Sequence, residues 1–278
     1  MVCTIKSKTE KSLVQILNEK GEENMVLSLF DLTGKTALVT GGSSGIGKGI
    51  ASAFLKAGAN LIIASENELM LIETKKEFLS LKKNFQVSTL TIDVSKPEEL
   101  ILLESKLQKY SKIDILVNAA GINIRKPILE TNIEDWNKII NVNLRGVYFV
   151  SRAVAKIMLK NKYGKIINIG SLTSSLGIPN IAPYGVTKSG VAQLSKTMAV
   201  EWAPYIQVNT IAPGYIDTNL TRPILEDLEK REKILNRIPL GRVGKPEDLY
   251  GAALFFASNA SDYITGQVLY IDGGWTAT

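Results

Sequence analysis

The residues of this chain best suited to acid–base chemistry are a tyrosine and a lysine four positions apart, Tyr184 and Lys188. In a helix, this spacing places both side chains on one face, one turn apart. Because an ammonium group stabilises a neighbouring phenolate, Lys188 is expected to lower the pKa of Tyr184 from its usual value near ~10. Taken alone, the pair favours the simpler interpretation of a packed tyrosine beside a surface lysine.

The composition removes most other catalytic arrangements. The 278 residues include no histidine and one cysteine, Cys3. A Ser-His-Asp triad, a Cys-His pair and a histidine-based zinc site are therefore excluded, and no metal site is expected. If the protein moves protons near neutral pH, a tyrosine, a lysine or a carboxylate must do so.

A glycine-rich turn stands between a predicted strand at Lys35–Thr40 and a helical pattern that begins near Gly47. Glycines let the backbone approach a pyrophosphate closely, and the helix N-terminus supplies free N–H groups. A second strand at Asn60–Ala64 then precedes Glu66, about where a ribose-binding carboxylate is expected. A lone glycine pattern is weak, so this context carries the interpretation.

The rest of the chain keeps alternating between strand and helix patterns. Further strands are expected at residues 86–92, 113–117, 165–169, 207–211 and 268–271, and helices at 96–110, 135–161, from Tyr184 to Trp202, and 246–257. This alternation predicts an α/β fold, a single Rossmann-type doubly wound parallel sheet of about seven strands with helices on both faces. Ligands bind at the carboxyl ends of such strands, where Asp93, Asn118, Ser171 and Pro213 stand.

These motifs, in this order, resemble those of the short-chain dehydrogenase/reductase family. TGGSSGIG (Thr40–Gly47) is similar to the family's cofactor turn, and NAAG (Asn118–Gly121) to its strand-four motif, with Ala119 where a second Asn often stands. PGYIDT (Pro213–Thr218) resembles the loop over the nicotinamide amide. The resemblance covers about Phe30–Trp275 and implies a nicotinamide-dependent oxidoreductase. Within the family, GINIRKP and RIPLGRVGKPEDL look most like dehydrogenases of gluconate and deoxygluconate, which act on a secondary alcohol or ketone of a sugar acid.

The resemblance also implies roles for individual residues. Tyr184 is the acid–base group, Lys188 holds the phenol partly ionised and contacts the nicotinamide ribose, and Ser171 donates a hydrogen bond to the substrate oxygen. Asn143 in NVNLRG anchors a water that links the lysine to solvent. Ser171 and Asn143 each have a structural alternative, but their joint occurrence favours an active site. The expected cofactor-binding residues are Gly41, Ser43, Ser44, Gly45, Ile46, Gly47, Glu66, Asp93, Val94, Asn118, Ala119, Gly121, Tyr184, Lys188, Pro213, Gly214, Ile216 and Thr218.

The choice between NAD and NADP depends on the end of the second strand. By resemblance, relatives that use NADP often carry arginine where Glu66 stands, and those that use NAD often carry aspartate where Ser65 stands. Glu66 can accept hydrogen bonds from ribose hydroxyls and would repel a 2′-phosphate, and Ser44 occupies the place of a basic residue in the turn. NAD is therefore expected. NADP is the alternative, with Lys48 as the nearby cation.

Arg125, four residues past Gly121, is expected to bind the substrate carboxylate. A guanidinium group recognises a planar carboxylate through two parallel hydrogen bonds. The structural alternative is a surface ion pair with Glu130 or Glu134. Arg222 is a rival anchor, because by resemblance its segment folds over the substrate.

The composition favours one domain. With 45% hydrophobic residues the chain can bury a full core, and no linker or repeat divides it. Residues 1–24 lack the apolar region of a signal peptide, so we expect a flexible extension followed by one domain over 25–278. No apolar stretch approaches ~20 residues, so no membrane span is expected. A single cysteine fits a reducing cytosol, hence a cytoplasmic location.

The expected partners are a small-molecule substrate and copies of the same chain. The net charge of +6 is scattered rather than striped, which argues against nucleic acid. The family is commonly tetrameric, so the resemblance implies a homotetramer.

Two other functions share the motifs. A 3-oxoacyl-[acyl-carrier-protein] reductase has the same catalytic residues but usually uses NADPH, against which Glu66 argues. A non-catalytic NAD(P)-binding sensor or scaffold belongs to another class, and the intact catalytic set argues against it.

Overall fold

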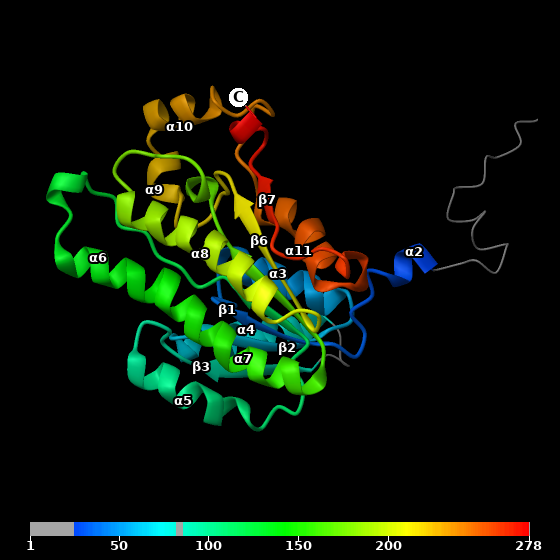
Figure 1. Ribbon diagram of the computed structural model, residues 1–278. Coiled ribbons are helices and arrows are strands. Elements are labelled where there is room, and N and C mark those ends of the chain that lie inside the picture. Colours follow the sequence, from blue (N-terminus) through cyan, green and yellow to red (C-terminus); the bar gives the residue numbers. More distant parts are fainter. Residues whose placement is uncertain (1–24, 82–85, 278) are drawn as a thin grey trace, which may run out of the picture.

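The sheet is built from seven parallel strands in the order β3-β2-β1-β4-β5-β6-β7. The computed structural model describes residues 25–81 and 86–277, so the extension expected at 1–24 lies outside the described residues. The predicted single Rossmann-type sheet is confirmed (Figure 1). The strands are β1 (Thr36–Thr40), β2 (Asn60–Ser65), β3 (Val87–Thr91), β4 (Ile115–Asn118), β5 (Gly164–Ile169), β6 (Ile206–Pro213) and β7 (Val268–Ile271).

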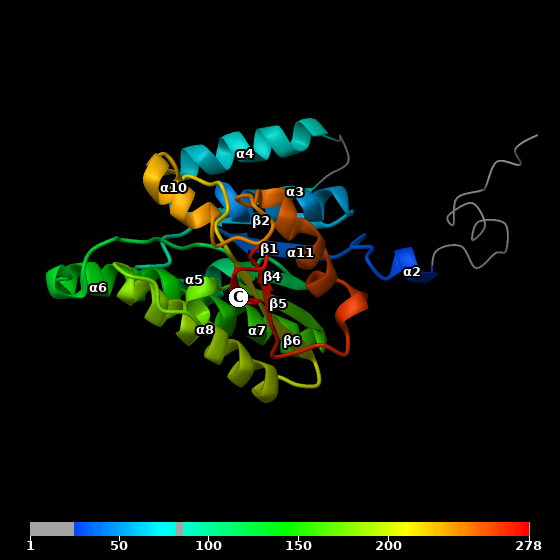
Figure 2. The same cartoon turned by 90° about the horizontal axis from the view of Figure 1, so that it is seen from above.

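Helices cover both faces of the sheet (Figure 2). The α-helices of the described residues are α2 (Met25–Ser28), α3 (Gly45–Lys56), α4 (Glu68–Leu81), α5 (Pro97–Leu107), α6 (Ile133–Ile140), α7 (Val147–Asn161), α8 (Ala182–Glu201), α9 (Arg222–Leu225), α10 (Leu228–Leu235) and α11 (Tyr250–Ala257). Short 3₁₀ turns are η1 (Ile128–Glu130), η3 (Leu172–Ser174), η4 (Pro246–Leu249), η5 (Asn259–Ser261) and η6 (Trp275–Ala277), and η2 (Asn141–Gly146) is π-helical.

The core forms two layers because successive strand side chains point to opposite faces. In β1, Ala37 and Val39 pack with residues of α3, α4 and α11, whereas Leu38 packs with residues of α5, α7 and α8. Both faces of the central strands are therefore buried, which explains why they read as continuous apolar runs.

The strand register brings the loops of interest to one edge. Thr40 pairs with both Ala64 and Asn118, and Asn118 pairs with Asn168, so four strands end in one row. The order of the strands reverses between β1 and β4, which is where open α/β sheets bind their ligands.

Three segments differ from the sequence-based expectation. The helix expected at 135–161 is three pieces, α6, the π-helical η2 and α7. The strand expected at 207–211 runs on as β6 to Pro213, whose pairing with Ile271 of β7 extends it. The helix expected at 246–257 is two pieces, the 3₁₀ turn η4 and the α-helix α11. In each case tertiary packing extends or interrupts what local propensity alone favours.

Candidate active site

Tyr184 and Lys188 lie one turn apart on α8, as their spacing predicted. Pro183 stands in the first turn of the helix, where a missing N–H costs nothing. The Lys188 Nζ donates to the Ile169 carbonyl oxygen at 2.7 Å and lies 5.6 Å from the centre of the Tyr184 ring. Burial lowers the pKa of Lys188 to about 8, so this ammonium group is poorly stabilised by its surroundings.

The expected direction of the Tyr184 pKa shift is wrong. Burial raises the pKa of Tyr184, and it outweighs the hydrogen bond from Ser171 and the positive charge of Arg125, which both lower it. The physical reason is that the Lys188 ammonium is directed to the Ile169 carbonyl oxygen rather than to the phenol. Desolvation of the phenolate therefore dominates.

Ser171 stands where β5 ends and faces Tyr184. Its Oγ accepts a hydrogen bond from the Thr173 N–H at 3.2 Å and shares one with the Tyr184 hydroxyl. Its own N–H donates to Ser174 Oγ, and Ser174 Oγ donates to the Lys188 carbonyl oxygen. These bonds connect η3, which follows Ser171, to α8, which carries Tyr184.

Asn143 lies in the π-helical η2 and is fully buried. Its Oδ1 accepts from the Ile122 N–H at 2.9 Å, and its Nδ2 donates to the Ile122 carbonyl oxygen at 2.9 Å and to Thr187 Oγ1 at 3.4 Å. Single π-helical turns often mark functional sites. Here the turn aims one amide at the loop after β4 and at α8 together.

The glycine turn is packed so tightly that Gly41 and Gly47 have no room for a side chain. Gly41 has φ +63°, and a Cβ there would lie 2.9 Å from the Ala120 N. A Cβ on Gly47 would lie 2.3 Å from the Gly41 carbonyl oxygen, so no side chain fits. Helix α3 begins at Gly45, and its first N–H groups point into this turn. These residues fit a dinucleotide cofactor.

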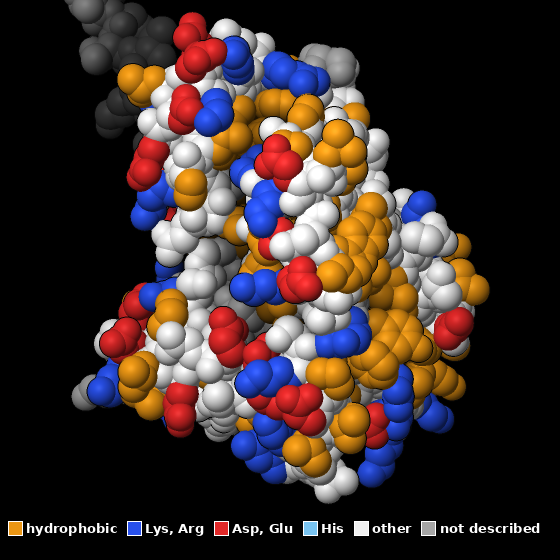
Figure 3. Space-filling model, turned by 90° about the vertical axis from the view of Figure 1, so that its left-hand side faces the viewer, with side chains coloured by type: hydrophobic (Ala, Val, Ile, Leu, Met, Phe, Trp, Pro, Cys, Tyr) orange, Lys and Arg blue, Asp and Glu red, His pale blue; other side chains and the backbone are white. Residues whose placement is uncertain are grey.

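A cavity of about 380 Å³ joins this turn to the neighbouring strand ends, and Figure 3 shows the hollow on this side of the molecule. Most of the predicted cofactor-binding residues line it. They are Gly41, Ser43, Ser44, Gly45, Ile46, Gly47, Glu66, Asp93, Val94, Ala119, Gly121 and Thr218. Sequence reasoning missed Ser65, Ser95, Ala120, Ile122, Lys138, Val142, Asn219 and Leu220.

Most of the missed residues are neighbours in sequence of predicted ones. Lys138 is the exception. The sequence feature that could have identified it is its spacing of one helical turn from Val142, which is next to Asn143. The predicted residues that do not line the cavity are Asn118, Tyr184, Lys188, Pro213, Gly214 and Ile216.

Two of these residues face the protein interior. The Asn118 amide donates to Ser151 Oγ at 2.9 Å and to Asn168 Oδ1 at 2.8 Å, in a buried network beneath the cavity. Ile216 is 3% exposed and packs in the core with Leu249. Their side chains support the cavity from behind, and any direct cofactor contact stays a prediction.

Gly121 connects the cavity to the acid–base residues. A Cβ built on Gly121 would lie 3.5 Å from Asn143 Oδ1 and 3.7 Å from Lys188 Nζ. Gly121 also lines the cavity. The cavity and the Tyr184–Lys188 pair are therefore adjacent, as a cofactor and its proton-transfer group must be.

Glu66 and Lys48 are the two charged residues on which the choice between NAD and NADP was expected to depend. Glu66 is exposed and lines the cavity. Lys48, the cation considered for a 2′-phosphate, forms an ion pair with Glu77 of α4 at 2.6 Å. The Glu66 carboxylate is thus open to the cavity, while the Lys48 ammonium is already paired with the Glu77 carboxylate.

Arg125 lies in a loop fixed on both sides. Its neighbour Lys126 donates from its N–H to the Asn180 carbonyl oxygen at 2.9 Å and pairs with Asp135 at 2.5 Å. In the described part of the chain Arg125 forms no ion pair with Glu130 or Glu134. Its charge acts instead on the phenol of Tyr184.

Within residues 25–81 and 86–277, no helix is long and apolar enough to cross a membrane. The same residues contain no group of three or more Asp, Glu, Cys or His side chains that could hold a metal ion.

Comparison with known proteins gives consistent matches. A family model described as enoyl-(acyl carrier protein) reductase matches residues 41–276. The chain is 45% identical over 247 residues to a 2-dehydro-3-deoxy-D-gluconate 5-dehydrogenase of Bacillus subtilis (strain 168), covering 88% of this chain and 96% of that protein. It is 42% identical to a 3-oxoacyl-[acyl-carrier-protein] reductase of Chlamydia muridarum (strain MoPn / Nigg), covering 87% and 98%.

The fold is also shared with solved structures. One is a gluconate 5-dehydrogenase from Burkholderia cenocepacia J2315 in complex with NADP and tartrate. It has 40% sequence identity and a TM-score of 0.87, over 91% of this chain and 99% of that chain.

Proposed function

Because the chain belongs to the short-chain dehydrogenase/reductase family and is a nicotinamide-dependent oxidoreductase of CH–OH groups, we propose that its substrate is a gluconate-type sugar acid. The reaction interconverts a secondary alcohol and a ketone, with Tyr184 as the acid–base group. The observation that carries the proposal is the 45% identity over 247 residues to a 2-dehydro-3-deoxy-D-gluconate 5-dehydrogenase, and Arg125, whose positive charge lowers the pKa of Tyr184, is the candidate anchor for the acid. A cation beside the proton-transfer group suits an anionic substrate.

The residues of the set divide the work of the reaction between them. When bound, the nicotinamide supplies or accepts the hydride. Tyr184 takes the alcohol proton in oxidation and returns it in reduction, and Ser171 donates a hydrogen bond to the substrate oxygen. Lys188 provides positive charge next to the phenol and to the ribose. Asn143 fixes Ile122, at the start of the loop that carries Arg125.

Relatives support the substrate class. The similar proteins named above include a 2-dehydro-3-deoxy-D-gluconate 5-dehydrogenase and a gluconate 5-dehydrogenase with bound tartrate. The second candidate is 3-oxoacyl-[acyl-carrier-protein] reductase, favoured by the 42% identity to such an enzyme. The acyl part of its thioester substrate carries no free carboxylate, so it offers Arg125 no carboxylate partner.

The Arg125→Met variant tests the substrate class. We expect KM for the sugar acid to rise by about 10–100-fold, the contribution of charge-assisted hydrogen bonds worth roughly 1.5–3 kcal/mol. KM for the uncharged polyol or lactone counterpart should barely change. Steady-state kinetics on both substrates give the two numbers.

Two further variants sharpen this test. Arg125→Lys keeps the charge but cannot form two parallel hydrogen bonds, so its KM for the acid should lie between those of the parent and Arg125→Met. Arg222→Met should leave KM for the acid unchanged. Equal losses on acid and neutral substrate would reduce Arg125 to a loop residue. A selective loss in Arg222→Met would move the anchor to α9.

We propose that NAD is preferred over NADP. Glu66 lines the cavity and would repel a 2′-phosphate, and Lys48 is already paired with Glu77. The Burkholderia cenocepacia relative was solved with NADP, so the preference proposed for this chain rests on its own residues.

Glu66→Arg should move the preference toward NADP. We expect the ratio of kcat/KM for NADP to that for NAD to rise by about 10–100-fold, because arginine replaces repulsion by a paired phosphate contact. Glu73→Arg on the exposed side of α4 makes the same charge change away from the cavity and should not alter the ratio. A parent enzyme with higher kcat/KM for NADP would overturn the assignment.

A homotetrameric assembly stays a prediction from the family resemblance, and a cytoplasmic location stays a prediction from the single cysteine.

A further inference from the structure

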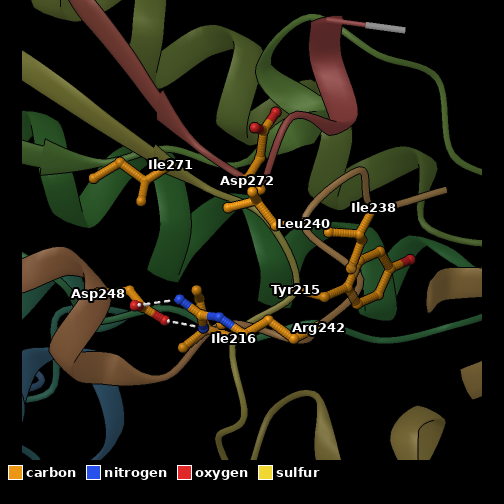
Figure 4. A pocket seen from close by; sticks show the side chains of 10 residues that line it. Tyr215, Ile216, Ile238, Leu240, Arg242, Asp248, Ile271 and Asp272 are labelled. Carbon is orange, nitrogen blue, oxygen red and sulfur yellow. Dashed lines mark hydrogen bonds and ion pairs between the residues drawn. The ribbon is translucent and has the colours of Figure 1, made fainter.

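A small cavity of about 170 Å³ is lined by residues of the 214–218 loop, of the 238–248 segment and of the end of β7 with the two residues after it (Figure 4). Tyr215 lies at one end beside Ile238, and Arg242 reaches past Ile216 to Asp248 at the other end. The volume of the cavity is below the range of about 300–1,000 Å³ that is usual for small-molecule sites. Two of the residues that line this cavity, Arg242 and Asp248, form an ion pair.

Arg242 and Asp248 form a pair with two parallel hydrogen bonds. Nη1 donates to Oδ2 at 2.7 Å, and Nη2 donates to Oδ1 at 2.8 Å. Oδ2 also accepts from the Lys245 N–H at 2.7 Å. The Arg242 hydrogen bonds, followed by that from the Lys245 N–H, lower the pKa of Asp248 to about 2, so the carboxylate stays charged at neutral pH.

The segment between these two residues is bonded to the loop. The Gly244 N–H donates to the Tyr215 carbonyl oxygen at 2.9 Å, and the Asp217 N–H donates to the Gly244 carbonyl oxygen at 2.9 Å. This pairing is a short parallel bridge between Ile216 and Gly244. A Cβ on Gly244 would lie 2.6 Å from Ile216 Cδ1, so the Ile216 side chain packs directly on the Gly244 backbone. The next residue of the loop, Thr218, lines the cofactor cavity.

The same segment also contacts the helix of the glycine turn. Asp248 belongs to η4, which leads directly into Tyr250. A Cβ on Gly49 of α3 would lie 2.7 Å from the Tyr250 Oη, so the tyrosine packs directly on that helix. The 242–250 segment therefore connects α3 with the 214–218 loop, through Tyr250 and Gly244.

We propose that the Arg242–Asp248 pair is a positioning device that holds the 214–218 loop against the cofactor cavity, so that cofactor affinity depends on it. The proposal rests on the assignment of that cavity to the cofactor. The pair touches neither the cavity nor Tyr184, and its residues act through Gly244 and the loop. An ordinary surface ion pair would contribute little and would leave the cofactor unaffected.

The test is the Kd for NADH, measured by fluorescence titration of the folded protein without substrate. Arg242→Ala and Asp248→Asn should each raise the Kd about 5–10-fold, and the double variant should be no worse than either, because the two residues act as one unit. Asp248→Ala should have a larger effect, since it also removes the acceptor of the Lys245 N–H. Arg242→Lys, which can make only one of the two bonds, should fall between the parent and Arg242→Ala.

The matched control is Glu104→Ala. Glu104 pairs with Lys156 at 2.7 Å on the outside of α5 and α7, away from the cofactor cavity. It should leave the Kd unchanged. At saturating NADH, kcat of the Arg242 and Asp248 variants should fall less than kcat/KM for the cofactor.

Unchanged Kd values in the Arg242 and Asp248 variants would overturn the proposal, even if their melting temperatures fall, because the pair would then serve stability alone. The same Kd increase in Glu104→Ala would overturn it too, because surface charge would then be the cause. Failure of the parent to bind either NADH or NADPH would refute the cofactor assignment and this proposal together. A wrong substrate class would leave the Kd result unaffected.

Discussion

Tyr184→Phe is expected to lower kcat/KM for the sugar acid by roughly 10²–10⁴-fold, the usual contribution of a general acid–base group. Phenylalanine keeps the ring and its packing on α8 and removes only the oxygen that shares a hydrogen bond with Ser171. The Kd for NADH should stay close to that of the parent. The measurement is steady-state kinetics beside a fluorescence titration of NADH on the same preparation.

Tyr163→Phe is the matched control. Its hydroxyl is buried and has no partner among the described residues, and it lies next to β5 at the end of the sheet opposite the active site. Removing it should leave turnover unchanged. Activity of Tyr184→Phe within about threefold of the parent would mean that another group transfers the proton.

Lys188→Met is expected to have the second largest effect, because the lysine serves both the phenol and the ribose. We expect kcat/KM to fall roughly 10²-fold or more and the Kd for NADH to rise about 10-fold, as for loss of a charge-assisted hydrogen bond. Lys165→Met provides the comparison. Lys165 is also buried but pairs with Asp262 away from the active site, so turnover of the folded protein should be unchanged.

The Lys188→Met variant should not be less stable than the parent at neutral pH. The folded pKa of Lys188 is about 8 and its ordinary value is 10.5, so the buried ammonium destabilises the fold below pH 8. This destabilisation fades as the pH rises from 8 to 10.5. Lys188→Met removes it at pH 7, and the melting temperature should be equal to or above that of the parent. A clear fall, with a parallel loss of activity, would make Lys188 a structural residue.

The positions of the functional residues were predictable because they depend on where strands end. Apolar runs gave the strands, and parallel pairing puts their carboxyl ends in one row, so Asp93, Asn118 and Ser171 had to share an edge. The spacing of Tyr184 and Lys188 likewise needed only helical geometry.

The directions of side chains were not predictable in the same way. Ile216 faces the core and the Asn118 amide joins a buried network, because each follows the pleat of its backbone and the partners that other segments bring. The π-helical turn at Asn143 is likewise set by packing between α6, α8 and the loop after β4 rather than by local propensity.

The pKa of Tyr184 is the clearest case. The nearby lysine suggested a lowered value, but a sequence does not report how deeply a phenol is buried or which acceptor an ammonium chooses. In the folded protein the Lys188 ammonium donates its hydrogen bond to the Ile169 carbonyl oxygen. Desolvation of the phenolate then decides the direction of the pKa shift of Tyr184.

The most direct test of the proposed function is kcat/KM in an NAD(H)-coupled absorbance assay that compares gluconate-type acids, their neutral polyols and an acetoacetyl thioester. The account predicts that a sugar acid is the best substrate, that its neutral counterpart is turned over with a higher KM, and that the thioester is poor. A thioester with the highest kcat/KM would contradict the account and identify an acyl-carrier-protein reductase. No turnover of any of the three would contradict it as well.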